Sequence, residues 1–360
     1  MYKNLTAQTI HYFARPQVGV LREPLSIGAA WRGSEMARRD DWRERLTEAD
    51  VAELDAALAT SRRSGKATRE LSREDFPLPT LTHKIDRWRG EVATGRGFQV
   101  LSGVPVTRWS QHDAETFFWC FGLHFGTPGA QNPQGDLLGH VIDTGESPEL
   151  VRHYRTRVNI NFHCDAADVV GLLCLQKAKR GGQSRIVSSV SVYNELVRRR
   201  PNAVDRLYQP FMMDTKGEGG VQYLPVRPCR YDGDHLRTFY HTDYFRSAVG
   251  FRGQPLLSLE DRIILDLYNE IAGSSDLYLD MDLQPGDIQL LSNHTILHAR
   301  TDYEDFPEPE RKRHLLRLWI SLPARTPLAT RLRTHRSRLG VAATAAGFKL
   351  GHAIRRATGG

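Results

Sequence analysis

Asn159-Ile160-Asn161-Phe162-His163-Cys164-Asp165 is a short stretch that predicts a β-strand, and residues 169–176 predict a second strand shortly after it. The turn pair Gly181-Gly182 separates these two from a third run at residues 185–190. Similar runs predict strands at residues 97–105, 277–283, 288–291 and 313–321. Many short strands with a few helices favour an α+β fold, mainly β, with a sandwich or barrel core rather than a doubly wound sheet.

Helices are predicted between these strands. Thr47 is a good N-cap residue and Asp50 lies in the first turn after it, so a helix is expected over residues 47–58. Helical spacing of apolar residues predicts further helices at residues 81–93, 111–122, 191–200 and 259–272. Residues 1–46 have only a few short apolar runs and are expected to be irregular. The chain contains no G-x-G-x-x-G and no Walker loop, so nucleotide binding of those types is not indicated.

The net positive charge is concentrated at one end of the chain. The 360 residues carry a net charge of +7, with 49 basic and 42 acidic residues. Seven basic residues and no acidic one lie in residues 331–360, so the remaining 330 residues hold 42 of each sign and are neutral. A nucleic-acid-binding domain needs a basic stripe on its folded surface, which this balance does not support. The tail is expected to be a solvated helix or a frayed end, with contact to a partner or an anionic surface as the alternative.

The composition is that of an ordinary globular protein, with 40% hydrophobic and 25% charged residues. No run approaches the ~18 apolar residues of a membrane-spanning helix, and the N-terminus lacks the basic and apolar regions of a secretory signal. A cytoplasmic location without a membrane partner is therefore expected. The four cysteines form no C-x-x-C pair, and each is expected to be a small buried residue.

His163-Cys164-Asp165 is the part of the sequence that indicates chemistry. Residues i and i+2 of a strand point to the same face, so His163 and Asp165 can reach one metal ion while Cys164 turns away. His298 is available as a third ligand, and His294 is the alternative to it. Two histidines and one carboxylate on one face of a metal form the site of non-haem Fe(II) oxygenases, with open positions for a chelating co-substrate and O2.

Two arginines follow His298 on a predicted strand. Arg313 and Arg317 are four residues apart, so they share one strand face with Leu315 and Trp319. Burying two guanidinium groups is costly unless an anionic group accompanies them. A dicarboxylate co-substrate, an anionic substrate or protein carboxylates would each meet this need, and the planar guanidinium suits a carboxylate. The arginines therefore favour His298 over His294 as the third ligand.

With these motifs in this order, the sequence resembles the taurine dioxygenase (TauD/TfdA) family of Fe(II)- and 2-oxoglutarate-dependent oxygenases. The matching pieces are residues 97–103, the His163/Asp165 pair, Gly181-Gly182-Gln183-Ser184, His298-Ala299-Arg300 and the Arg313/Arg317 pair. The resemblance covers residues 97–323, and its specificity comes from the order and spacing of the five pieces together. It implies a double-stranded β-helix (jelly roll) core with flanking helices.

The resemblance also implies roles for these residues. His163, Asp165 and His298 would bind Fe(II). Arg313 would bind the distal carboxylate of 2-oxoglutarate, with Ser184 beside it where the family usually has threonine.

Residues nearer the substrate are implied with less detail. Arg317 would face an anionic group of the substrate or support the co-substrate, and Asn159 would lie near the substrate. His241-Thr242-Asp243 is a second His-x-Asp pair, which the family pattern places toward the substrate rather than on iron.

The implied reaction oxidises, most simply hydroxylates, a C–H bond of a small anionic or zwitterionic molecule and releases succinate and CO2. The alternatives are desaturation, epoxidation or cyclisation with the same cofactors, and, from another class, a catalytically silent ligand-binding or sensor jelly roll. The expected partners are a small-molecule substrate and O2, with no nucleic acid; a homo-oligomer is left open. The expected parts are an irregular and helical extension (residues 1–90), the oxygenase domain (residues 91–325) and the basic tail (residues 326–360).

Overall fold

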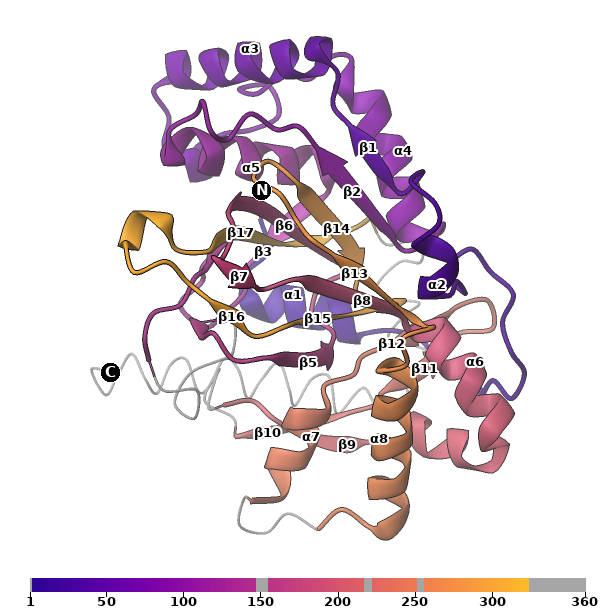
Figure 1. Ribbon diagram of the computed structural model, residues 1–360. Coiled ribbons are helices and arrows are strands. Elements are labelled where there is room, and N and C mark those ends of the chain that lie inside the picture. The colour runs from indigo at the N-terminus through magenta and orange to yellow at the C-terminus, as the bar shows by residue number, and fades with distance from the viewer. Residues whose placement is uncertain (1, 147–154, 217–221, 251–255, 324–360) are drawn as a thin grey trace, which may run out of the picture.

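Two β-sheets form the centre of the molecule (Figure 1). The computed structural model describes residues 2–146, 155–216, 222–250 and 256–323. The predicted basic tail, residues 326–360, lies outside these described residues. Within them, the larger sheet has seven strands and the smaller has four.

The larger sheet has the order β1-β2-β14-β6-β17-β3, and β4 also pairs with β17. All its pairs are antiparallel except β1 with β2. Its strands are β1 (Arg43–Arg45), β2 (Phe98–Ser102), β14 (Ile288–Ser292), β6 (Val169–Gln176), β17 (His314–Ser321), β3 (Thr127–Gly129) and β4 (Leu138–Val141). Because β1 is its edge strand, the segment before residue 91 contributes to this sheet.

The smaller sheet has the order β13-β8-β15-β5 and is antiparallel throughout. Its strands are β13 (Tyr278–Met281), β8 (Ser184–Ser188), β15 (Ile296–Arg300) and β5 (Ile160–His163). Short pairs lie outside the two sheets: β7 (Arg180–Gly181) with β16 (Tyr303–Glu304), β9 (Phe211–Asp214) with β10 (Tyr223–Val226), and β11 (Cys229–Tyr231) with β12 (Leu236–Thr238).

The alternation of side chains along the strands builds separate cores on the two faces of each sheet. On β17, Leu315 and Trp319 belong to an apolar core with side chains of both sheets, such as Val170 and Ile296. The sheets are therefore packed face to face, as the prediction of a sandwich requires. Every second β17 residue belongs instead to the core under the helices that cover the larger sheet: Leu316, Leu318 and Ile320.

Helices cover the outer faces of both sheets (Figure 1). The larger sheet is covered by α3 (Glu48–Ser64), α4 (Leu81–Ala93) and α5 (Gln111–Phe125), and the smaller by α6 (Ser189–Arg199) and α8 (Leu259–Ala272). The predicted cap of α3 is confirmed, because the Thr47 hydroxyl accepts the N–H of Asp50 and the Asp50 carboxylate accepts the N–H of Thr47. The remaining short helices are α2 (Gly33–Met36) and α7 (Thr242–Ser247).

The prediction that residues 1–46 are irregular is wrong at the N-terminus, where α1 spans Leu5–Phe13. Its buried face is largely polar: Gln8 accepts a hydrogen bond from Ser321 and donates one to the carbonyl of Ala166. This face therefore gives no apolar signal at helical spacing. Asn4, whose side chain accepts the N–H of Ala7, caps the helix.

Asp168 fixes α1 to the rest of the fold. Its buried carboxylate accepts hydrogen bonds from His11 Nε2 at 2.6 Å, His294 Nε2 at 2.8 Å and the N–H of Leu322 at 2.9 Å, and it pairs with Arg15. Burial alone would raise the pKa of Asp168, but its hydrogen bonds with His11 and His294 and the charge of Arg15 hold that pKa well below its ordinary value. One ionised carboxylate thus joins the α1 region, the β14–β15 turn and the end of β17.

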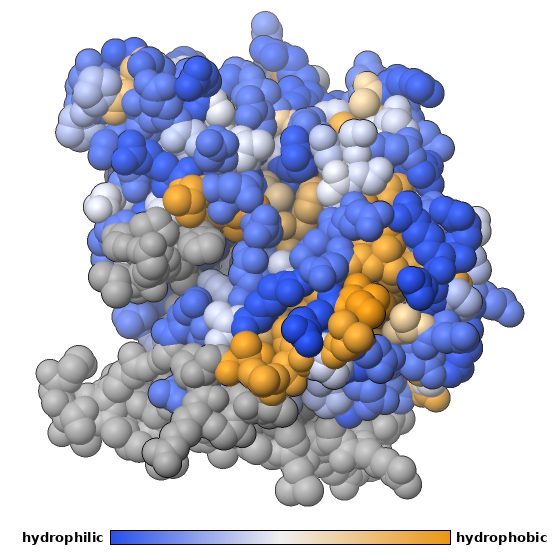
Figure 2. All heavy atoms as spheres, turned by 60° about the horizontal axis from the view of Figure 1, so that its bottom comes forward, coloured by the Kyte–Doolittle hydropathy of each residue, from blue (hydrophilic) through white to orange (hydrophobic). Residues whose placement is uncertain are grey.

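At the end of the molecule that holds the start of α8, hydrophobic and hydrophilic side chains lie next to one another on the surface (Figure 2). Leu256, Leu259 and Ile263 expose 81%, 67% and 45% of their surface there. Such exposed apolar side chains are compatible with a contact between copies of the chain, and the homo-oligomer stays a prediction. Among the described residues, no helix combines the length and the apolar character needed to cross a membrane.

Asp168→Asn should destabilise the fold strongly. The amide would leave Arg15 without its charged partner and turn an N–H₂ group toward groups that donate, so we expect a loss of about 3–5 kcal/mol in the free energy of unfolding. The control is Asp282→Asn, which removes an exposed ion pair to Lys177 and should cost about 1 kcal/mol or less. Urea unfolding of both variants measures the difference, and equal losses would contradict the anchoring role of Asp168.

Candidate metal centre and its pocket

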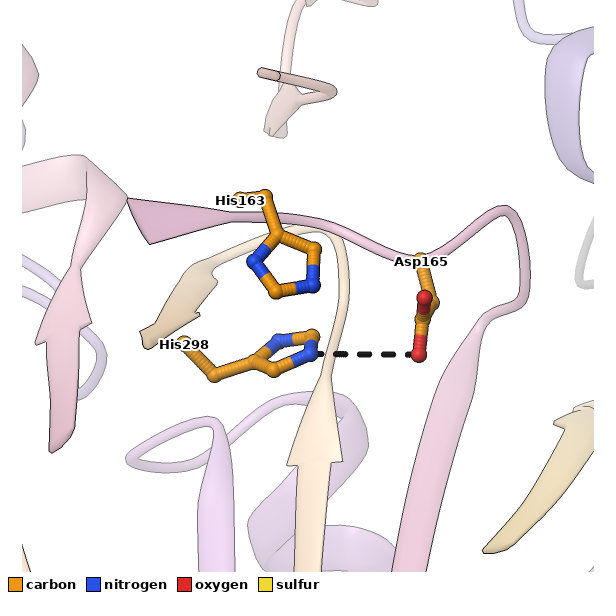
Figure 3. A group of neighbouring side chains, drawn as sticks. All are labelled: His163, Asp165 and His298. Atoms are coloured by element: carbon orange, nitrogen blue, oxygen red, sulfur yellow. Dashed lines mark ion pairs between the residues drawn. The ribbon is translucent and has the colours of Figure 1, made fainter. Parts of the chain in front are cut away.

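His163, Asp165 and His298 converge at the end of β5 (Figure 3). One ligand atom from each lies within 4.8 Å of the others, and Nε2 of His298 is 3.8 Å from Oδ2 of Asp165. The pairing of β15 with β5 sets His298 directly opposite His163, and their ring centroids are 4.2 Å apart. The structure therefore brings together the three residues that the sequence nominates as metal ligands.

Local hydrogen bonds orient two of the three ligands. Nδ1 of His163 is 2.9 Å from the carbonyl oxygen of Asn161, so it carries the proton and leaves Nε2 to bind a metal. The N–H of Asp165 donates to the side chain of Asn293 at 3.0 Å. Oδ2 of Asp165 is buried and has no hydrogen-bond partner among the described residues, and the same is true of Nδ1 of His298.

The charge states of the three side chains suit a cation. Burial lowers the pKa of His163. Burial also lowers the pKa of His298 to about 3, with a further contribution from the neighbouring ring of His163. Both rings are therefore neutral near pH 7. Burial acts to raise the pKa of Asp165, but Arg317 and His298 outweigh it and the pKa is lowered. A buried carboxylate with an unpartnered oxygen beside two neutral imidazoles is a donor set that fits Fe(II).

Arg317 lies on β17 beside this group, with Nη1 3.8 Å from Oδ2 of Asp165. Its guanidinium is oriented by Gln131, whose side-chain oxygen accepts the Nε–H at 2.7 Å. The amide of Gln131 donates to the backbone carbonyls of Leu137 and Arg317. Gln131 is thus a buried support for Arg317, and no motif in the sequence could reveal it.

Arg313 lies just before β17 and is also buried, with 6% of its surface exposed. Its backbone N–H donates to Asp305 at 2.8 Å, its guanidinium lies over the ring of Tyr303, and Nη1 has no partner among the described residues. Gly182 makes room for it: a Cβ there would lie 3.0 Å from Nε of Arg313. Ser184 is buried on β8 and donates to Gln289 at 2.9 Å.

A pocket opens from the metal-binding group. Its polar lining includes His163, Asp165 and Arg317, and its apolar lining includes Ile160, Met213, Leu224 and Phe239. Helix α1 adds Leu5, Thr9 and Phe13, which lie four residues apart and so occupy one helix face. The N-terminal segment therefore forms a wall of the pocket, a role that its irregular-looking sequence did not reveal.

The other histidines of the sequence analysis lie nearby in different surroundings. His241 forms a β-bridge to His163 and lines the pocket, with its ring stacked on Tyr244 at 3.6 Å. Asp243 accepts hydrogen bonds from Asn161. His294 is bound to Asp168, so it contributes to the anchor of α1. Asn159 donates to Asn161 and lines a neighbouring polar pocket, so its contact with a substrate stays a prediction.

Comparison with known proteins identifies the family. Residues 62–319 match the model of the taurine catabolism dioxygenase TauD, TfdA family. The chain belongs to this family. It is accordingly an enzyme of the non-haem oxygenase type, with Fe(II) and 2-oxoglutarate as its cofactors, and the family predicted from the five motifs is confirmed.

Two individual relatives match most of this chain at moderate sequence identity. The chain is 29% identical over 336 residues to FR-33289 synthase of Streptomyces rubellomurinus, covering 89% of this chain and 96% of that protein. It is 29% identical over 305 residues to the taurine hydroxylase-like protein SAT17 of Stachybotrys chartarum, covering 80% and 77%.

Solved structures share the fold at low sequence identity. The asparagine oxygenase complex with Fe(II), 3-hydroxyasparagine and succinate matches with a TM-score of 0.63 at 15% identity, covering 78% of this TauD-family chain and 93% of that one. The non-haem iron oxygenase OrfP with Fe, succinate and (3S)-hydroxy-L-Arg matches with a TM-score of 0.59 at 12% identity, covering 79% and 95%. These likenesses show a common fold with mixed helices and several sheets.

Gly182→Ala should displace Arg313. Gly182 has φ +72° and its missing Cβ would press on Nε of Arg313, so we expect a loss of stability of about 1–2 kcal/mol and weaker binding of 2-oxoglutarate. The control is Gly65→Ala, where φ is +65° but no atom lies within 4 Å of the added Cβ. The control should show the backbone strain alone. Thermal unfolding and a 2-oxoglutarate titration check both variants, and unchanged affinity in Gly182→Ala would contradict the contact.

Proposed function

We propose that this TauD-family enzyme hydroxylates a C–H bond of a small anionic or zwitterionic molecule, using O2 and 2-oxoglutarate and releasing succinate and CO2. The observation that carries the proposal is the convergence of His163, Asp165 and His298 around a buried carboxylate oxygen that has no hydrogen-bond partner among the described residues. In this proposal the three side chains bind Fe(II) on one face, and the two sheets form a double-stranded β-helix around them. Bound Fe(II) and 2-oxoglutarate supply the oxidising chemistry.

The protein's own residues hold the reactants. Arg313 and Ser184 bind the distal carboxylate of 2-oxoglutarate, an assignment supported by Nη1 of Arg313, which is buried without a hydrogen-bond partner in the part of the chain that the structure describes. Arg317, 3.8 Å from Asp165, faces either the prime substrate or the iron-side end of the co-substrate. His163 keeps its proton on Nδ1 through the carbonyl of Asn161, so Nε2 stays available as a donor.

The pocket supports a substrate with a charged end and an apolar part. Arg317 supplies a buried cation next to the metal-binding group. Farther out, Leu5 and Phe13 of α1 share the pocket with Met213 and Phe239. Apolar walls of this kind also exclude water from the reacting atoms. Asn159, which lines the neighbouring polar pocket, stays a proposed contact for a polar group of the substrate.

The iron assignment is tested by removing each ligand. His163→Ala, Asp165→Ala and His298→Ala should each abolish turnover and weaken Fe(II) binding, because each removes one of only three protein donors. His241→Ala should retain its affinity for Fe(II), although it lines the pocket. Anaerobic titration with Fe(II) and 2-oxoglutarate, followed by the visible charge-transfer band, measures this without any prime substrate. Loss of iron in His241→Ala and its retention in His163→Ala would show that the wrong pair was chosen.

The two arginines should separate by role. Arg313→Gln should raise KM for 2-oxoglutarate, whereas Arg317→Gln should act mainly on the prime substrate or uncouple 2-oxoglutarate consumption from its oxidation. Loss of one charge-assisted hydrogen bond is worth roughly 1.5–3 kcal/mol, which corresponds to about a 10- to 150-fold change. Lysine should rescue each only in part, because it lacks the planar fork. Succinate release measured while each reactant is varied decides between the roles, and the opposite pattern would reverse them.

A further inference from the structure

Arg300 is a second buried guanidinium close to Arg313, and neither the motifs nor the proposed function gives it a role. It exposes 6% of its surface. Its Nη2 donates to the carbonyls of Thr156 and Val158, but Nε and Nη1 are buried without a hydrogen-bond partner among the described residues. The two carbonyls therefore account for only one of its three nitrogens. Unsatisfied buried donors of a charged group are costly and indicate a missing partner.

The register of the smaller sheet places Arg300 beside the proposed co-substrate site. On β15, Arg300 is two residues from His298, so both point to the same sheet face. Opposite them on β8 lie Ser184 and Ile186, and Ile186 belongs to the core between the sheets. Arg300 therefore faces inward next to Ser184. It lies roughly 7 Å along the strand from the metal ligand His298, a distance that a short dicarboxylate can span.

Arg300 and Arg313 share one neighbour. The guanidinium carbons of Arg300 and Arg313 lie 4.8 Å and 5.2 Å from the ring centroid of Tyr303. Burial lowers the pKa of Arg313, and burial together with the charge of Arg313 lowers that of Arg300 to about 10. Both groups are thus cations near pH 7 that are held close together.

No protein carboxylate pairs with these two guanidinium groups among the described residues. Asp143 pairs with Arg157, and Asp305 accepts the backbone N–H of Arg313 rather than its side chain. Asp143 and Asp305 therefore act on the charge of Arg300 from nearby without bonding to it. Nε and Nη1 of Arg300 and Nη1 of Arg313 are left as three buried donors that an anionic ligand would satisfy.

We infer that Arg300 binds the distal carboxylate of 2-oxoglutarate together with Arg313 and Ser184, so that two guanidinium groups hold this end of the co-substrate. The inference rests on the proposed function, because it uses the same co-substrate site. It makes Arg300 a determinant of selectivity for a 2-oxo acid with a second carboxylate. Arg300 has no part in binding iron. Replacing it should therefore not change the affinity for a 2-oxo acid that lacks the distal carboxylate.

The test compares two ligands under anaerobic conditions. 2-Oxoglutarate and 2-oxopentanoate have the same chain length and the same iron-chelating end, but only the first has a distal carboxylate. Arg300→Gln should raise the Kd of 2-oxoglutarate by about 10-fold or more and leave the Kd of 2-oxopentanoate and of Fe(II) unchanged. The charge-transfer band of the Fe(II) complex and calorimetric titration give these constants without turnover.

Arg185→Gln is the matched control. Arg185 lies on the neighbouring strand β8, pairs with Asp280 at 2.6 Å and is opposite Ala299 in the register, so it occupies the outer sheet face. Removing it changes the charge of the sheet by the same amount and should leave both 2-oxo acid affinities at the wild-type values. A loss of 2-oxoglutarate affinity in this control equal to that in Arg300→Gln would contradict a specific contact.

Arg300→Lys is a second variant in case Arg300→Gln does not fold, because Arg300 also donates hydrogen bonds to two backbone carbonyls before β5. Thermal unfolding shows which variants are folded. If Arg300→Gln is unfolded, Arg300→Lys should still bind 2-oxoglutarate several-fold more weakly than wild type and 2-oxopentanoate equally well. Unchanged affinity for 2-oxoglutarate, or an equal loss for both ligands, overturns the inference. Failure of the wild-type protein to bind 2-oxoglutarate with Fe(II) would instead overturn the proposed function.

Discussion

The antiparallel pairing of β15 with β5 and β8 is the constraint on which the site depends. One register sets His298 opposite His163, and the other sets Arg300 opposite Ser184. Because side chains alternate along a strand, the candidate metal ligand His298 and the arginine two residues later must face the same interior. A shift of one residue would turn both to the outer face, where Leu297 and Val187 now pack against helices.

The interior created by this register contains buried polar groups that lack partners in the described part of the fold itself. Among the described residues, Arg300 and Arg313 have no paired carboxylate, and an oxygen of Asp165 has no hydrogen-bond partner. Apolar side chains in these positions would make the fold more stable, because unpaired buried charges cost several kcal/mol. The three apolar cores of the fold offset that cost. The arrangement is therefore best understood as a site prepared for a cation at one end and an anion at the other.

Those parts of the fold whose signals are local could be predicted from the sequence. The helix expected at residues 81–93 and the strand expected at residues 169–176 have those bounds in the structure, and the Thr47–Asp50 cap is present. Helix α1 escaped prediction because Gln8 and Thr9, on its buried face, are polar and give no apolar periodicity. β15 carries His298 and Arg300 on its inner face, so its pattern also departs from that of an ordinary core strand.

The site was predictable only where the chemistry requires a fixed residue type. The His-x-Asp pair and the distal histidine have few substitutes as a metal-binding set, so their spacing is visible in one sequence. The pocket walls have no such restriction: Phe13, Gln131 and Met213 come from segments that only the folded chain brings together. Gln131 acts through Arg317, and its position is fixed by two backbone carbonyls that no sequence pattern shows.

The segment from Asp165 to Asp168 contains both a candidate metal ligand and the residue that anchors one wall of the pocket. Asp165 offers its unpartnered oxygen to the metal position, while Asp168, three residues later, binds His11 and Arg15 of the α1 region. The same short segment thus fixes a candidate metal ligand and the helix that forms one pocket wall. Because α1 presents Leu5 and Phe13 to that pocket, the contacts of Asp168 fix the position of this wall relative to Asp165. In the proposed function, coupling of this kind would hold the C–H bond of a bound substrate at a constant distance from the oxidising centre, which selective oxidation requires.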